Sequence, residues 1–242
     1  MIFHKRNKIT VDAFTDQEHI STYPIDRSNK HLPEWYQKMK PTVGHTCPQG
    51  LTGKTSTFKM CHGFQDHVNT SFTFPLWADL MFKVNIDNTF VYQYPNKHCN
   101  FGMESHNSVE STPMAEFAPK RHIKLFSPWL LKEKTGVNFY WSQAFWSYGA
   151  AASEVLVPPG VVNYKYQNGT HINLMVEPGK QVDLDAGTPM VYLHPLTEKK
   201  VEIKTHVVDT KEYQKVKAST VSNKFIGGYK SFKRKQNAPT LD

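Results

Sequence analysis

The sequence lacks long apolar runs. Its apolar stretches all fall well short of the roughly 18 consecutive residues that a membrane-spanning helix needs. The segment from Met1 to Lys8 is charged and no apolar stretch follows it, which is unlike a secretory signal peptide. We therefore expect a protein that is neither exported by a leader nor bound to a membrane.

Cysteine is scarce and oddly placed. The three cysteines, Cys47, Cys61 and Cys99, are an odd number at wide spacing. That arrangement gives neither a disulfide framework nor the Cys-x-x-Cys pairs of a zinc site. We expect free thiols in a reducing compartment.

Signatures of catalysis and of metal binding are also missing, although the chain has 12 histidines. No histidine is followed two residues later by Asp, Glu or His, the spacing that metal-dependent jelly rolls use on one strand. There is no Gly-x-Ser-x-Gly elbow and no dinucleotide-binding glycine pattern. The absence of any cofactor is the simpler expectation, and a divalent metal would have to use dispersed ligands. The candidate ligands are His98, Glu104, His106 and His194.

What the sequence does contain is the pattern of short β-strands. It is 39% hydrophobic and 13% aromatic, and aromatic residues suit half-buried sheets. From Ser71 onward, alternating runs are separated by turn pairs such as Asn168-Gly169 at intervals of about 8–12 residues, as in sandwiches. No long helical pattern lies between these runs, so we expect antiparallel pairing throughout. The expected fold is mainly β: a single antiparallel jelly-roll or β-sandwich domain with short N-terminal helices and a C-terminal helix and tail.

The chain divides into three expected segments. Residues 1–57 are predicted to be an irregular lead-in with one short helix near Pro33, because prolines punctuate this polar stretch. Residues 58–210 are predicted to form the β-sandwich or jelly-roll domain, opening with a second short helix at 58–67. Residues 211–242 are predicted to form a basic C-terminal helix and tail. Pro75, within the first predicted strand, is expected at an edge or a bulge.

The positive charge is concentrated in the last segment. From Lys211 to the end there are eight basic and two acidic residues, whereas the first 210 residues hold 21 basic and 19 acidic ones. Aromatic residues lie among these lysines, so the tail could bind nucleic acid through phosphate contacts and stacking, dock on a protein partner, or stay solvated. The candidate contacts are Lys224, Lys230, Lys233, Arg234 and Lys235.

Aromatic residues gather between positions 129 and 148. Such a group could form the floor of a pocket for a sugar, a base or a peptide, or it could be the ordinary core of a sandwich. The candidate ligand-binding residues are Trp129, Tyr140, Trp141 and Trp146.

Five short motifs carry a resemblance to a known family. They are Leu32-Pro33-Glu34-Trp35-Tyr36, Cys61-His62-Gly63-Phe64, Phe74-Pro75-Leu76-Trp77-Ala78-Asp79, Ser127-Pro128-Trp129 and Asp185-Ala186-Gly187-Thr188-Pro189-Met190. Over residues 30 to 205 the chain resembles an uncharacterised family of tailed phages of marine bacteria and cyanobacteria. The resemblance implies a β-sandwich or double-stranded β-helix fold and a viral origin, and it supplies no catalytic residues.

The leading hypothesis is a non-enzymatic phage-type protein, structural or interaction-mediating, that docks on a protein partner or on further copies of itself through loops and its basic tail. It would work in the cytoplasm of the host cell or in the virion. One alternative is a cupin-like metal-dependent enzyme or small-molecule binder. The other is nucleic-acid binding through the tail.

Overall fold

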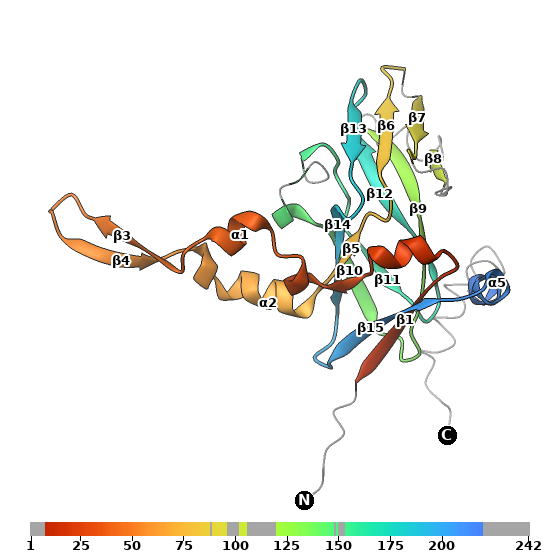
Figure 1. The fold of residues 1–242 in the computed structure, drawn as a ribbon, viewed down its shortest axis with the longest axis horizontal. Helices are drawn as coiled ribbons and strands as arrows, with labels where there is room; N and C mark the ends of the chain where they lie inside the picture. The colour runs from red at the N-terminus through yellow and green to blue at the C-terminus, as the bar shows by residue number, and fades with distance from the viewer. Residues whose placement is uncertain are drawn as a thin grey trace, which may run out of the picture.

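Two five-stranded sheets enclose one hydrophobic core in the computed structural model, which describes residues 8–87, 89–95, 102–105, 120–147, 149 and 153–219 (Figure 1). Sheet A has the strand order β12-β9-β1-β15, and β8 also pairs with β9. Sheet B has the order β11-β10-β14-β5-β2. The predicted mainly β, sandwich-like architecture is confirmed.

Sheet A consists of β1 (Ile9–Thr15), β8 (Met103–Ser105), β9 (Arg121–Lys132), β12 (Gly169–Val176) and β15 (Val201–Val207). Sheet B consists of β2 (Asp26–Arg27), β5 (Phe72–Pro75), β10 (Asn138–Gln143), β11 (Gly160–Asn163) and β14 (Pro189–Pro195). A third sheet contains β6 (Leu80–Val84), β7 (Phe90–Gln93) and β13 (Gln181–Leu184), and β3 (Thr42–Thr46) pairs with β4 (Thr52–Ser56) alone.

The helical elements are short. The 3-10 turns are η1 (Glu18–Thr22), η2 (Ser28–Lys30), η3 (Phe58–Met60) and η4 (Phe145–Ser147). The α-helices are α1 (Glu34–Lys38), α2 (His62–Thr70) and α5 (Thr210–Ala218). The helix expected at 58–67 therefore divides into η3 and α2. The C-terminal helix begins at Thr210 because the Asp209 side chain caps it by accepting the Glu212 N–H at 2.7 Å.

The N-terminal segment departs most from the sequence prediction. Residues 1–57 were expected to be irregular, but β1 occupies a central place in sheet A between β9 and β15. Its residues alternate as a half-buried strand should: Ile9, Val11, Ala13 and Thr15 are buried, and the residues between them are half-buried. The expectation of antiparallel pairing throughout is also wrong, because β1 pairs with β15 in parallel, Ile9 opposite Val201 and Thr15 opposite Val207.

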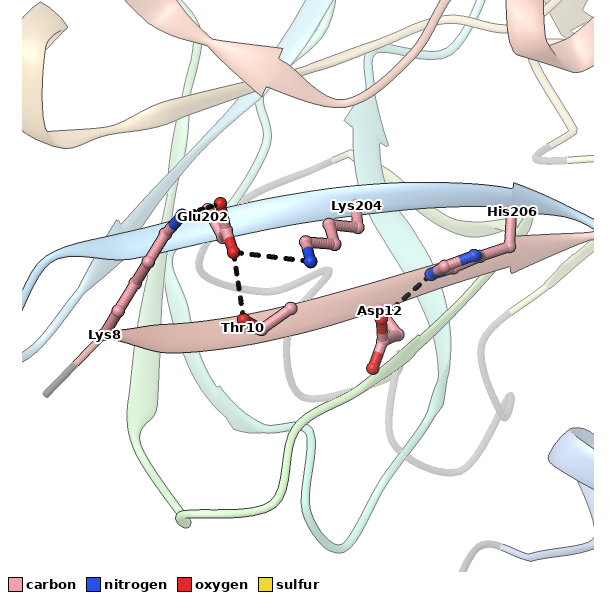
Figure 2. Close-up of polar contacts among 6 residues, drawn as sticks. All are labelled: Lys8, Thr10, Asp12, Glu202, Lys204 and His206. Carbon is pink, nitrogen blue, oxygen red and sulfur yellow. Dashed lines mark hydrogen bonds and ion pairs between the residues drawn. The ribbon is translucent and has the colours of Figure 1, made fainter.

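The outer face of the β1–β15 pair carries a network of charged side chains (Figure 2). Glu202 pairs with Lys8, accepts the Thr10 hydroxyl at 3.1 Å and lies 3.7 Å from the Lys204 ammonium. Chiefly through the contact with Lys8, this network lowers the pKa of Glu202. Farther along, Asp12 Oδ1 lies 2.8 Å from His206 Nε2. Exposed ion pairs of this kind contribute little stability, so the association of β1 with β15 depends on the apolar side chains of the opposite face.

The apolar stretch 72–84, whose alternating pattern is typical of one strand, divides between two sheets. Residues 72–75 join sheet B as β5, and residues 80–84 join the third sheet as β6. Pro75 lies opposite a register shift in β14, which confirms the expected bulge. Between the strands, Leu76 exchanges main-chain hydrogen bonds with the turn at Gly187, whose φ is +84°. A side chain there would meet the Tyr23 ring at 3.0 Å, so the position requires glycine.

Arg27 links both sheets to helix α2. Its guanidinium donates to the carbonyl oxygens of Asn69 at 3.3 Å and Thr70 at 3.0 Å, and also to that of Val201 in β15. The guanidinium carbon lies 4.2 Å from the centroid of the Phe72 ring in β5. One side chain thus contacts the end of α2, sheet A and sheet B.

The role of β1 can be tested with two adjacent substitutions. Val11→Ala removes buried methyl groups from the core and is expected to lower the free energy of unfolding by about 2 kcal/mol. Thr10→Ala acts on the outer face of the same strand and is expected to cost less than about 1 kcal/mol. Urea unfolding of both variants measures the difference. Equal, small losses would contradict a core position for β1.

Candidate functional site

A hairpin without tertiary packing projects from the body of the molecule (Figure 1). It comprises β3, a turn at Cys47–Leu51 and β4, residues 42–56, and we call it the arm. All ten residues of its two strands are exposed. Its turn is closed by a main-chain hydrogen bond from Cys47 N to Leu51 O at 2.9 Å, with Gly50 at φ +78°. No face of this hairpin is buried against the described part of its own chain.

The two faces of the arm differ. Because side chains alternate along a strand and directly opposed residues share a face, Val43 and His45 lie with Thr55 and, at the turn, Leu51. Val43 is 45% exposed and Leu51 is 72% exposed. The opposite face carries threonines and Lys54. One face thus offers apolar side chains to solvent, and the other is wholly polar.

A second, small hydrophobic cluster anchors the arm. Tyr36 of α1 and Phe64 and Val68 of α2 are its buried members, and we call this group the arm base. Trp146 of η4 joins it from the body, with its ring 5.1 Å from that of Phe58 and 5.4 Å from that of Phe64. The Trp35 Nε1–H donates to the Trp146 carbonyl at 3.0 Å. The arm is therefore exposed but fixed at its root.

Two histidines lie where α2 meets sheet B. The rings of His67 and His194 are 4.7 Å apart, and the Tyr192 ring lies perpendicular to His67 at 4.6 Å. Burial, assisted by His194, lowers the pKa of His67 to about 4, and burial also lowers the pKa of His194. The Nε2 atom of His67 is buried without a hydrogen-bond partner. Both rings are thus neutral at pH 7. His67 acts there as a packing group, whereas His194 Nε2 also lies 3.4 Å from the Ser142 hydroxyl oxygen.

The arm and its base carry a small excess of positive charge. Residues 34–70, which hold α1, the arm and α2, contain four lysines and two acidic side chains, Glu34 and Asp66, whereas residues 71–210 contain 12 basic and 13 acidic side chains. The arm itself contains one lysine, Lys54, and no Asp or Glu.

The structure disperses the four aromatic residues predicted to form one ligand floor. Trp129 is wholly buried in the main core, and Trp141 packs in that core against Phe74 at 5.6 Å between ring centroids. Tyr140 points to the opposite face of β10, where its ring lies 6.0 Å from that of His194. Trp146 belongs to the arm base. Of the four, Trp141 lines a cavity, which lies between β11 and β12.

The predicted metal ligands do not come together within the described residues. Glu104 lies on β8 in sheet A, where its carboxylate is 3.5 Å from the Lys124 ammonium, whereas His194 lies on β14 in sheet B. No three His, Cys, Asp or Glu side chains of the described chain gather as metal ligands would. His98 and His106 fall outside the described residues, as do the tail candidates Lys224, Lys230, Lys233, Arg234 and Lys235.

Comparison with known proteins assigns the chain to no family. No protein-family model and no curated protein matches the chain. Among the described residues, no helix is both long and apolar enough to cross a bilayer.

The histidine pair predicts acid sensitivity. The folded-state pKa of His67 lies below that of a free histidine, so between pH 6.5 and 4 the unfolded chain binds more protons, and stability falls as the pH falls. Because both rings are half-buried, we expect the pair to lower the free energy of unfolding by about 1–2 kcal/mol over this pH range. His67→Phe should reduce the dependence of the free energy of unfolding on pH in this range. Urea unfolding from pH 7 to pH 4 measures that dependence. His45→Gln, on the exposed arm, serves as the control. An unchanged slope in His67→Phe would contradict the assignment.

Proposed function

We propose that the protein is a non-enzymatic, phage-type assembly protein whose arm docks on the body of a second copy of the chain. The observation that carries the proposal is that every residue in both strands of the arm is exposed. Such a protein would act in the cytoplasm of an infected host cell or in the virion.

The arm gains little stability from contacts with the rest of its own chain. A two-stranded hairpin is marginally stable in water, and ordering each residue costs about 1–2 kcal/mol of conformational entropy. No buried face offsets that cost here, although Val43 and Leu51 present apolar surface. A partner that covers this face would supply the missing burial. A projecting, rooted hairpin therefore suits insertion into a neighbouring subunit.

Charge and symmetry favour a second copy as that partner. The arm carries one lysine, Lys54, and no acidic residue, and residues 71–210 carry 13 acidic and 12 basic side chains. Lys54 of one molecule would pair with a carboxylate on the body of another, which guides association and register. Symmetric assemblies of identical chains are the commonest oligomers of soluble proteins.

Removal of the arm tests the proposal. Thr57 N donates to Pro41 O at 2.9 Å, so an Asn-Gly pair can replace residues 42–56 and close a two-residue turn between them. Sedimentation velocity of the intact protein is expected to show self-association that rises with concentration. The arm-deleted protein is expected to stay monomeric and to keep the melting temperature of its core.

Charge reversal provides a milder version of the test. Lys54→Glu should weaken self-association about tenfold, because it replaces the positive charge of the arm by a negative one that would repel the carboxylate Lys54 pairs with. Lys83→Glu is the matched control, since Lys83 is an exposed strand lysine on β6, outside the arm. An intact protein that is monomeric at every concentration, or an arm-deleted protein that associates equally well, would contradict the proposal.

A further inference from the structure

The arm and the helices α1 and α2 form a unit with a hydrophobic cluster of its own. That cluster, the arm base, is separate from the main core of the sandwich. Among the contacts that join the unit to the sandwich, Trp146 packs into the arm base, Arg27 binds the carbonyls at the end of α2, and His67 packs on sheet B. Because these contacts lie outside the main core, α2 can open locally without unfolding the sandwich.

Two histidine rings meet where α2 packs on sheet B. His67 lies three residues before the end of α2, and Tyr192 and His194 lie two residues apart on β14, so both project from the same face of that strand. The rings of His67 and His194 are 4.7 Å apart, and the Tyr192 ring lies 4.6 Å from that of His67. We call the contact of His67 with His194 the histidine contact. One ring belongs to each part, so a charge on either ring acts directly on their association.

The groups of sheet B that face the histidine contact carry no negative charge near pH 7. On β10, the Tyr140 ring lies 6.0 Å from that of His194, and the Ser142 hydroxyl oxygen lies 3.4 Å from His194 Nε2. On β14, burial raises the pKa of Tyr192 to about 12, so its phenol stays neutral.

The charged groups of the other elements beside α2 are engaged elsewhere or point to solvent. η2 and β2 also pack on α2, where the Asp26 carboxylate binds the Lys30 ammonium at 2.7 Å and Arg27 binds main-chain carbonyls. On α2 itself, Asp66 is exposed. The pKa of His67 is lowered by burial and by His194, and that of His194 by burial. No carboxylate of the described chain therefore stabilises a proton on either ring.

A proton on these rings opposes the contact. Neutral rings pack as aromatic groups, but a half-buried imidazolium without a counter-charge is disfavoured, and two imidazolium rings at this separation repel. The pKa of His67 is about 4 while the contact is closed, whereas a solvated histidine takes up its proton near pH 6.5. The open form thus binds more protons between pH 6.5 and 4, and opening is favoured as the pH falls through that range.

We propose that the histidine contact is an acid-sensitive switch, in which protonation of His67 and His194 frees α2 from sheet B and loosens the root of the arm while the sandwich stays folded. Its consequence for assembly rests on the proposed function of the arm. A loosened arm loses more entropy on docking than a fixed one, so assemblies built through the arm would dissociate in acid.

Hydrogen exchange tests the switch without reference to assembly. The intact chain is diluted until it is monomeric, and mass spectrometry follows peptides from α2 and from β12 at pH 7 and pH 5, each corrected for its intrinsic exchange rate. The pKa difference of His67 alone would favour opening about twentyfold over this range, and partial solvation reduces that value. We expect the protection of α2 to fall at least tenfold and that of β12 to hold. If α2 keeps its protection, or if β12 loses as much, the switch is refuted.

Three substitutions identify the responsible rings. His67→Phe keeps a flat ring beside Tyr192 but cannot take up a proton, so most of the pH response of α2 should disappear. His194→Gln removes the repulsion and should give a smaller response than the intact protein, which keeps the test available if His67→Phe unsettles the helix. His62→Gln is the matched control, because His62 is an exposed histidine of the same helix, and it should keep the full response. A full response in both His67→Phe and His194→Gln would overturn the switch.

Sedimentation velocity at pH 7 and pH 5 separates the switch from the proposed function. The intact chain is expected to associate at pH 7 and at least tenfold more weakly at pH 5, and His67→Phe should lose most of that difference. A chain that is monomeric at pH 7 would refute docking through the arm, and opening of α2 in that monomer would still support the switch. Equal association at both pH values, with α2 open at pH 5, would refute control of assembly by the switch.

Discussion

The guanidinium of Arg27 holds together three parts of the molecule that are far apart in sequence. The last carbonyls of a helix have no partners within the helix and carry partial negative charge. Arg27 satisfies those of Asn69 and Thr70 at the end of α2, and the same group reaches the Val201 carbonyl at the edge of β15. Its planar face lies over Phe72. A lysine could not make this set of contacts, because they need several donors fixed in one plane.

This arrangement decides where the arm points. α2 supplies most of the arm base, and its far end is held by Arg27 against both sheets. His67 adds a packing contact to sheet B through Tyr192 and His194. The hairpin itself is exposed, so its direction follows from the rigidity of its root. A neighbouring molecule would meet an arm in a preset position, which reduces the entropy lost on docking.

Sheet A imposes a second constraint, on the order of folding. β1 lies between β9 and β15, so its neighbours come from the middle and the far end of the described chain. Pairs such as Thr10 and Glu202 are separated by 192 residues. Contacts of such long range form late and slow folding, because loop closure must precede any gain from packing. The β9–β12 pair and the β10–β14 pair can form before β1 finds its place.

The sequence predicts strands well where one face is buried, and poorly elsewhere. β12 and β15 belong to the alternating runs predicted from Ser71 onward, because apolar side chains alternate along both. The arm strands Thr42–Thr46 and Thr52–Ser56 bury no face, so they carry no such alternation and read as irregular. β1 does alternate, but Asp12 and the polar residues around the strand obscure it.

Side-chain direction limited the prediction of sites in the same way. Tyr140 and Trp141 are neighbours in sequence, yet a strand sends them to opposite faces, so an aromatic-rich segment does not make one aromatic surface. The cavity between β11 and β12 could not be read from any motif. It arises from Pro158 and Pro159, which end one pairing, and from a crossing between sheets, and both depend on the tertiary fold.

The arm base and the cavity share no residue. The base consists of Tyr36, Phe64 and Val68 with the side chains packed on them, whereas the cavity is lined by residues between 141 and 173. A second copy that covers the arm therefore need not cover the cavity. The two features also differ in chemistry, since the strands of the arm are exposed and carry Lys54, whereas the cavity lining is partly buried and contains no Asp, Glu, Lys or Arg.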